Sequence, residues 1–325
     1  MKKLKIAVMG LGAYGRGWAY VAAKNPAAEL VAVIDRSEDA LNAVDLPAGK
    51  YTDLDAAIEE AKPEAVVLVV PPRLHIMIAE KLVKQGIAVL CEKPICEELP
   101  EAEDFLKLCV AENHVCSIAE NFRYRPVFRE AKRMLLEGAV GKLLRVNCRY
   151  VSYHPDASNA YHGALKHPLL CDVTVHHLDV ARYLTGGEPE TVFCTEHSAP
   201  HTWYGDRPAS AEISSEMTNG IYFTYSGTTA SPVSVTDSFG EWELIGEKAV
   251  MRISGTSVTL YTAQNEKAIW EFSDRGDTRE PLLDGFVRTV LENTVGESDI
   301  RDNFKSFRWT QKAMESAEKR EKLTL

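Results

Sequence analysis

The chain has 325 residues, more than a single hydrophobic core usually holds, and it therefore predicts two domains. Hydrophobic residues make up 45% and charged residues 26%, which is typical of a globular protein, and no apolar stretch approaches the roughly 18 residues of a membrane span. The net charge of −10 disfavours nucleic-acid phosphates and no basic run offsets it, so the expected partner is a small molecule rather than a nucleic acid or a membrane.

The first element is an apolar strand over residues 5–9, which leads directly into a glycine turn, GLGAYG, at residues 10–15. A helical pattern over 13–24 and a second apolar strand over 30–34 follow, and Asp35 stands at the end of that strand. This is the order of a dinucleotide-binding βαβ unit. The lysine-rich start resembles a signal peptide, but glycines and Arg16 interrupt the apolar run, which favours the folded motif and a cytoplasmic protein.

The glycines of this turn have separate expected roles. Gly10 permits the tight turn, Gly12 lets the backbone approach a pyrophosphate, and Gly15 allows close packing of helix and sheet. The first N–H groups of the helix, at Ala13 and Tyr14, are expected to point at the phosphates, where the helix dipole favours negative charge.

The residues after the second strand bear on the choice of cofactor. Asp35 is expected to accept a hydrogen bond from the adenosine ribose and to repel a 2′-phosphate, which favours NAD. NADP is the alternative, because the neighbouring Arg36 could hold a 2′-phosphate.

The rest of the first 120 residues alternates strand and helix. Residues 65–70, 87–90 and 115–119 read as strands, residues 73–85 as a helix, and Pro100 opens another helix. Continuous apolar runs are typical of parallel strands that are buried on both faces. We therefore predict an α/β fold that begins with a Rossmann-type, doubly wound parallel sheet over residues 1–120.

The pattern changes after about residue 121. Helices are expected over 127–136, 172–184 and 282–292, and a long strand over 143–151. Residues 191–272 are rich in Thr, Val, Ile, Tyr and Phe with recurring turn residues, which predicts an antiparallel sheet. We expect a substrate-binding and oligomerisation α+β domain over 121–303. A charged amphipathic helix in residues 304–325 is expected to pack back on the first domain.

Two groups of residues suggest the chemistry. Lys93 follows a buried strand, at the edge of the sheet where ligands bind, and precedes Pro94. Asp172 and His176 are four residues apart and share one helix face, which suits proton transfer and hydroxyl binding. Asp179 could continue that row, whereas His177 points away and is expected to pack or cap.

Metal binding is the competing use of the histidines at 154, 162, 167, 176 and 177, but their spacing matches no strict ligand motif and we expect no metal. The seven cysteines are odd in number and show no zinc-knuckle spacing. They are expected to be reduced thiols packed as small hydrophobic residues.

The glycine turn at 10–15, the segment PPRLH at 71–75, the segment CEKP at 91–94 and the D-x3-H-x2-D pattern at 172–179 occur in this order. Together they resemble the Gfo/Idh/MocA oxidoreductases, the family of glucose–fructose oxidoreductase and inositol dehydrogenase. The resemblance covers nearly the whole chain. It implies an N-terminal Rossmann domain, and a C-terminal domain with an open, mostly antiparallel sheet whose face commonly builds homodimers or homotetramers.

The resemblance also implies residue roles. Lys93 matches the catalytic lysine, Asp172 the substrate-orienting acid and His176 the acid/base. Further residues are expected near the cofactor or the cleft: Pro71, His75, Glu92, Asn121 and Arg123.

Tyr153, Tyr161 and His162 lie between the long strand and the catalytic helix and are candidates for the substrate wall, although ordinary loop residues are the alternative. Many family members place two or three glycines just before that helix, but this chain has ALKHPLL at 164–170, which leaves the pocket shape and the substrate open.

The expected activity is NAD(P)-dependent hydride transfer at a secondary hydroxyl or carbonyl of a sugar, sugar acid or cyclitol. An NAD-recycling glycosidase of the same fold and a non-catalytic NAD-binding sensor are the alternatives.

Overall fold

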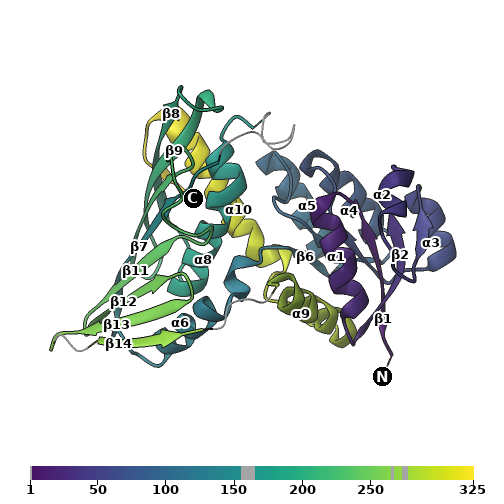
Figure 1. The fold of residues 1–325 in the computed structure, drawn as a ribbon, viewed down its shortest axis with the longest axis horizontal. Helices are drawn as coiled ribbons and strands as arrows, with labels where there is room; N and C mark the ends of the chain where they lie inside the picture. Colours follow the sequence, from purple (N-terminus) through teal and green to yellow (C-terminus); the bar gives the residue numbers. More distant parts are fainter. Residues whose placement is uncertain (1, 155–164, 265–266, 273–276) are drawn as a thin grey trace. The chain divides into compact units, whose positions relative to one another are not determined.

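The computed structural model describes residues 2–154, 165–264, 267–272 and 277–325. They form two compact units, and Figure 1 labels helices and strands of both. Unit 1 comprises Met1–Asn121 and Asp277–Phe304, and unit 2 comprises Phe122–Gly276 and Lys305–Leu325. This division differs from the expected one, because the chain returns to unit 1 after the large sheet.

Unit 1 is built on six parallel strands in the order β3-β2-β1-β4-β5-β6. The strands are β1 (Leu4–Met9), β2 (Ala28–Ile34), β3 (Gly49–Tyr51), β4 (Ala65–Leu68), β5 (Ala88–Cys91) and β6 (Cys116–Ile118). Every residue of β4 and β5 is buried, as expected when helices cover both faces of a parallel sheet. The predicted doubly wound sheet is confirmed.

Seven helical elements belong to the described part of unit 1, and side chains cap two of them. They are α1 (Ala13–Lys24), α2 (Glu38–Asn42), α3 (Leu54–Ala61), η1 (Pro72–Leu74), α4 (His75–Val83), α5 (Leu99–Ala111) and α9 (Arg279–Glu292). Ser37 and Asp53 cap α2 and α3 by accepting hydrogen bonds from backbone N–H groups. α9 joins unit 1 because it packs on α1, and Asn25 donates to Asp284 over 2.7 Å.

Unit 2 contains a nine-stranded sheet in the order β14-β13-β12-β11-β7-β10-β9-β8-β15. Its strands are β7 (Leu143–Val151), β8 (Thr191–Ala199), β9 (Gly205–Glu216), β10 (Tyr222–Thr228), β11 (Glu241–Gly246), β12 (Ala249–Ser254), β13 (Ser257–Thr262), β14 (Lys267–Glu271) and β15 (Leu323–Thr324). The pairs are antiparallel except for β7 with β10. The expected mostly antiparallel sheet is therefore confirmed.

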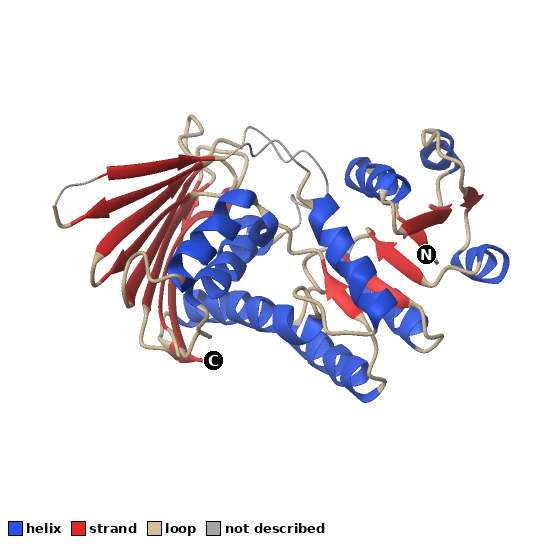
Figure 2. Cartoon of the chain, turned by 90° about the horizontal axis from the view of Figure 1, so that it is seen from below, coloured by secondary structure: helices blue, strands red, loops and turns tan. Residues whose placement is uncertain are grey.

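One face of this sheet is covered by helices, which Figure 2 shows as a blue layer beside the red strands. The covering elements are η2 (Phe122–Tyr124), α6 (Pro126–Leu136), the π-helical turn η3 (Leu170–Thr174), α8 (Val175–Thr185) and α10 (Ile300–Lys319). Buried and exposed positions alternate along β12, as expected of a sheet that packs on one face only. The core between the layers includes Tyr150, Phe223 and Trp242.

The C-terminal helix corrects an expectation. α10 starts in unit 1 at Ile300, but its part from Lys305 onward belongs to unit 2. There Trp309 is fully buried and donates its indole N–H to Ser215 over 3.0 Å. Trp309, Ala313 and Met314 lie in the core of unit 2, and residues 305–325 therefore belong to the second unit.

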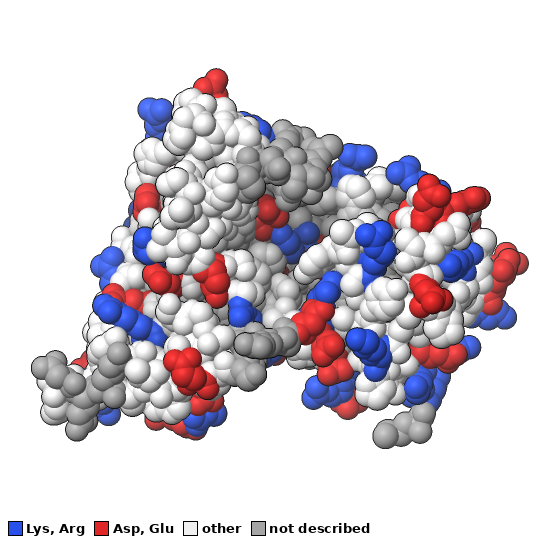
Figure 3. Space-filling model, in the orientation of Figure 1, with Lys and Arg blue, Asp and Glu red and all other residues white. Residues whose placement is uncertain are grey.

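Charges of both signs are interspersed on the face that Figure 3 shows, without one dominant basic patch on that face. Among the described residues, no helix combines the length and the apolar character that a membrane crossing requires.

Candidate functional site

The glycine turn after β1 depends on two positions where a side chain cannot fit. Gly10 has a φ of +92°, and a Cβ there would lie 2.1 Å from the carbonyl oxygen of Val69. A Cβ on Gly15 would lie 1.8 Å from the carbonyl oxygen of Gly10. Both contacts are shorter than atoms tolerate, so these glycines are needed for the turn itself.

Gly12 is different, because a Cβ at this position would meet no described atom within 4 Å. Gly12, Ala13 and Tyr14 are exposed, and no side chain caps the N-terminus of α1. The open backbone at a helix N-terminus suits an anionic pyrophosphate. The site therefore fits a dinucleotide, and Gly12 is the glycine that leaves room for it.

Asp35 is held at the end of β2 by two backbone donors. Its Oδ2 accepts from the N–H of Leu11 over 2.6 Å, and its Oδ1 accepts from the N–H of Ser37 over 2.9 Å. A carboxylate has about four acceptor positions, so lone pairs remain for ribose hydroxyls. Arg36 is exposed.

His75 joins two loops at the carboxyl edge of the sheet. Its Nδ1 lies 2.9 Å from the Pro94 carbonyl oxygen and its Nε2 lies 2.8 Å from the Val70 carbonyl oxygen. Burial lowers the pKa of His75, and the carbonyl contacts oppose this effect. The buried ring thus fixes the loop after β4, where Pro71 is exposed, to the loop that follows Lys93.

Lys93 lies two residues after the end of β5, is half-buried, and forms a cis peptide bond with Pro94. Its neighbour Glu92 was expected on a cofactor-proximal loop, but its side chain is only 8% exposed. The Glu92 carboxyl accepts from the Trp18 indole N–H over 2.6 Å and from the Lys93 backbone N–H over 3.2 Å. Burial raises the pKa of Glu92 to about 7, against the opposing effects of Trp18 and Lys93.

Unit 1 also contains a segment that the sequence analysis missed. Asn121 donates to the hydroxyl of Thr278 over 2.8 Å. The next residue, Arg279, is paired with Asp277, donates to the backbone carbonyl of Tyr14 over 3.2 Å, and lies 5.0 Å from the centroid of the Tyr14 ring. The segment lies more than 260 residues from the glycine turn, so no local sequence motif links the two.

Asp172 and His176 lie about one turn apart in unit 2, but the turn is not a regular α-helix. Asp172 lies in the π-helical turn η3, and His176 lies in the first turn of α8. π-helical turns within helices are frequent at functional sites. Asp172 is half-buried and His176 is 6% exposed.

Two tyrosines border Asp172. Burial raises the pKa of Tyr150 to about 12, and the negative charge of Asp172 contributes to this increase. Burial also raises the pKa of Tyr204, again with a contribution from Asp172. The Tyr150 hydroxyl lies 3.3 Å from Nε2 of His154. Neither tyrosine was singled out from the sequence, because Tyr150 in β7 and Tyr204, just before β9, are more than 20 residues from Asp172 along the chain.

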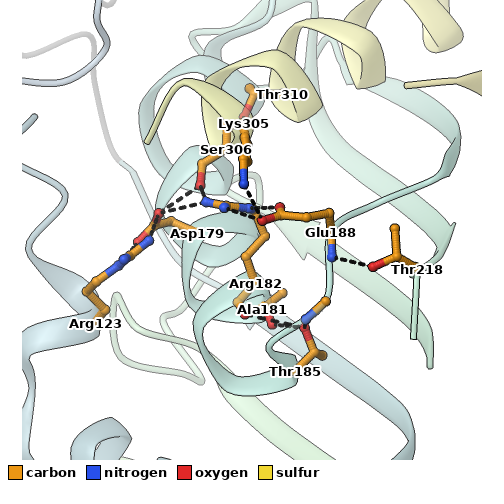
Figure 4. A network of polar contacts seen from close by, with 11 residues as sticks. Arg123, Asp179, Ala181, Arg182, Thr185, Glu188, Thr218, Lys305, Ser306 and Thr310 are labelled. Atoms are coloured by element: carbon orange, nitrogen blue, oxygen red, sulfur yellow. Dashed lines mark hydrogen bonds and ion pairs between the residues drawn. The ribbon is translucent and has the colours of Figure 1, made fainter. Parts of the chain in front are cut away.

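Figure 4 shows Arg123 and Asp179 side by side in a network of polar contacts. The Arg123 guanidinium binds the Asp179 carboxylate through two nitrogens, and the two side chains are 5% and 0% exposed. Asp179 also accepts from Ser306 over 2.7 Å, and Ser306 accepts from Arg182 over 2.8 Å. The expectation is that Arg123 borders the cleft, and the structure shows that its buried pair with Asp179 attaches α8 to η2.

The remaining candidates have the following positions. His177 is fully buried and donates from Nε2 to the Ser238 carbonyl oxygen over 3.0 Å, which confirms the expected packing role. Tyr153 is 50% exposed just after β7. Tyr161 and His162 lie outside the described residues. Within the described ranges, no three metal-ligating side chains come together.

Two family models match the chain. The oxidoreductase family with an NAD-binding Rossmann fold, GFO_IDH_MocA, matches residues 4–120, and the GFO/IDH/MocA C-terminal domain matches residues 128–252. The first match identifies unit 1 as an NAD-binding domain, in agreement with the open turn at Gly12.

The chain is also similar to individual proteins, in sequence or in fold. The chain is 29% identical over 300 residues to inositol 2-dehydrogenase from Rhizobium meliloti, covering 90% of this chain and 86% of that protein. It is 25% identical over 232 residues to 2,7-anhydro-N-acetylneuraminate hydratase from Mediterraneibacter gnavus, covering 68% of this chain but only 60% of that protein. A crystal structure of an oxidoreductase from Agrobacterium radiobacter with NAD+, L-tartaric acid and magnesium superposes with a TM-score of 0.88 at 18% identity, over 99% of this chain and 98% of that one.

Proposed function

The chain belongs to the Gfo/Idh/MocA oxidoreductases, and we propose that it oxidises a secondary hydroxyl group of a sugar, sugar acid or cyclitol, or catalyses the reverse reduction. The observation that carries the proposal is the pair Asp172 and His176, one turn apart in a chain whose other unit binds NAD. The inositol substrate in the name of the Rhizobium meliloti relative supports a polyhydroxylated substrate class.

Two features of unit 1 would hold the NAD cofactor. The open turn at Gly12–Tyr14 offers N–H groups to the pyrophosphate, and the oriented carboxylate of Asp35 offers acceptors to the ribose. Bound NAD supplies the hydride acceptor at the nicotinamide ring. Because the Asp35 carboxylate repels a 2′-phosphate, we propose NAD as the working cofactor and NADP as the weaker one.

We assign the proton chemistry to three side chains. His176 takes the hydroxyl proton as the carbon–oxygen bond of the alcohol becomes a carbonyl. Lys93 donates a hydrogen bond to the reacting oxygen and stabilises the negative charge that develops on it. Asp172 accepts a hydrogen bond from a neighbouring hydroxyl group and thereby orients the substrate.

The test is the absorbance at 340 nm of protein with NAD+ or NADP+ and a panel of cyclitols, sugars and sugar acids. Lys93→Met and His176→Ala should each lower kcat by roughly 10²-fold or more while the Kd for NAD+ changes by no more than about threefold. Lys107→Met and His197→Ala are matched controls at exposed positions. Unchanged kcat in Lys93→Met and His176→Ala would refute these roles.

A second candidate follows from the hydratase among the relatives, since its named reaction adds water and involves no net oxidation. In such a reaction, for example in an NAD-recycling glycosidase, the cofactor would return to its starting state in each turnover. Product formation from a glycoside without added NAD+ and without a change at 340 nm would favour this candidate. A non-catalytic sensor would bind NAD but give no product with any substrate.

We further propose that the open face of the unit 2 sheet joins copies of the chain into a homodimer or homotetramer. This face carries a groove of about 560 Å³ whose lining includes Arg149, Glu241, Glu243 and Arg252. Within the chain, Arg149 pairs with Glu241 and Arg252 pairs with Glu243, so the face offers a second copy a polar surface whose charges are balanced. Light scattering should give the mass of a dimer or tetramer, and a monomer would refute the proposal.

The seven free thiols, six of them buried, support a reducing compartment such as the cytoplasm.

A further inference from the structure

His176 is stacked on an aromatic ring that no motif marks. The centroids of the His176 and Phe122 rings are 4.1 Å apart and their planes differ by 10°. The exposed fractions of the two residues are 6% and 9%, so the contact is nearly closed to water. Parallel rings at this distance restrict rotation of the imidazole about its side-chain bonds.

A second aromatic ring also contacts Phe122, tilted by 49° from it. The Phe239 ring packs against Phe122 with centroids 4.3 Å apart. Above Phe239, the guanidinium carbon of Arg125 lies 3.3 Å from the ring centroid, in the geometry of a cation–π contact. Arg125 is also 3.8 Å from the Asp237 carboxylate, and Asp237 accepts from the Phe239 N–H over 3.0 Å. The outer end of the stack is therefore fixed by an ion pair and by the turn that carries Phe239.

The position of Phe122 is fixed by the ion pair of the next residue, Arg123. Phe122 and Arg123 are consecutive residues of η2, and they contact His176 and Asp179, which are three residues apart on α8. Because residues three apart share a helix face, one short segment binds α8 at two adjacent points. The buried Arg123–Asp179 pair sets the position of η2, and this places the Phe122 ring against the imidazole.

We propose that Phe122 is a positioning residue for His176, with Phe239 and Arg125 supporting it from behind. The inference rests on the proposed acid/base role of His176. Proton transfer requires the acceptor nitrogen at hydrogen-bond distance and in line with the donor, and a displacement of about 1 Å can cost on the order of 10² in rate. The stack holds the ring in one orientation before substrate binds.

The first measurement is spectroscopic and needs no substrate. In protein with ¹³C-labelled histidine, the His176 signal is identified by its loss in His176→Gln. Stacking on Phe122 should displace the His176 ring proton upfield. Phe122→Leu should abolish this displacement, whereas Phe122→Tyr, which keeps the ring, should preserve it. A His176 signal that is the same in the wild type and Phe122→Leu would overturn the proposal.

The second measurement is kinetic, with NAD+ and whichever polyol the panel identifies as the substrate. Phe122→Leu should lower kcat roughly 10- to 100-fold with an unchanged Kd for NAD+, and Phe122→Tyr should restore most of it. Phe223→Leu is the matched control, because Phe223 is fully buried in the same core but packs on Trp242 and Trp309. An equal loss of kcat in Phe223→Leu would show a general packing effect and overturn the proposal.

The two measurements separate this inference from the proposed function. If His176→Ala retains full kcat, the acid/base role fails while the spectra still show whether Phe122 orients the ring. If His176→Ala is inactive and Phe122→Leu is as active as the wild type, the positioning role alone is refuted.

Discussion

Glu92→Gln offers a quantitative test of the buried carboxyl beside Lys93. The raised pKa of Glu92, about 7 against 4.5 for the free side chain, means that the folded state binds the Glu92 proton more tightly than the unfolded state. Stability from this group is therefore fully present below pH 4.5 and is lost as the pH rises through 7. Glutamine resembles the protonated carboxyl and does not titrate, so the variant should lack this loss.

The magnitude follows from the two pKa values. A difference of about 2.5 units corresponds to about 3 kcal/mol at high pH, and most of it falls between pH 5 and pH 8. Relative to the wild type, Glu92→Gln should gain roughly 2–3 kcal/mol in free energy of unfolding between these two pH values.

The assay is urea unfolding at pH 5 and pH 8, followed by far-ultraviolet circular dichroism. Glu29→Gln, an exposed change in a strand of the same unit, is the control and should show no such gain. If the difference between wild type and Glu92→Gln is the same at both pH values, the carboxyl does not titrate in the way that its burial implies.

Three further changes test separate parts of the structure. Gly12→Ala should raise the Kd for NAD+ about tenfold or more with little change in stability, because its methyl group enters space left for the cofactor; calorimetric titration and thermal unfolding measure the two effects. Arg123→Gln should lower the free energy of unfolding by about 3 kcal/mol in urea, since it removes the bidentate partner of the fully buried Asp179 carboxylate and leaves the more distant Arg182, 4.0 Å away. Hydrogen bonds to Glu196 and Glu318 outweigh burial and raise the pKa of His167, so this stabilisation is present at low pH and is lost as the pH rises; His167→Asn should destabilise more at pH 6 than at pH 9, and an equal loss at both would contradict the argument.

The parts of the site that follow from local rules could be predicted from the sequence. The turn at Gly10–Gly15 and the acid at Asp35 are set by backbone geometry and by spacing within one βαβ unit. Asp172 and His176 are four residues apart, in the π-helical turn and in the first turn of α8, so their spacing in the chain predicts that they lie about one turn apart. Such features depend on residues that are close in the chain.

The missed features depend on pairs that are far apart in the chain. The ion pair of Arg123 joins it to Asp179, which lies 56 positions later in the chain. The contact of Arg279 with Tyr14 spans 265 positions, and no composition signal marks it. The π-helical turn at Asp172 was missed because a helical hydrophobic pattern does not separate an α turn from a π turn. The amphipathic face of the C-terminal helix could be recognised in the sequence. The surface that this face covers could not.

The central claim is tested most directly by one experiment: absorbance at 340 nm after mixing the protein with NAD+ and a panel that begins with myo-inositol, with Lys93→Met measured in parallel. The account predicts that at least one polyol produces NADH and that Lys93→Met lowers the rate by roughly 10²-fold. No NADH from any cyclitol, sugar or sugar acid, or equal rates in the wild type and Lys93→Met, would contradict it.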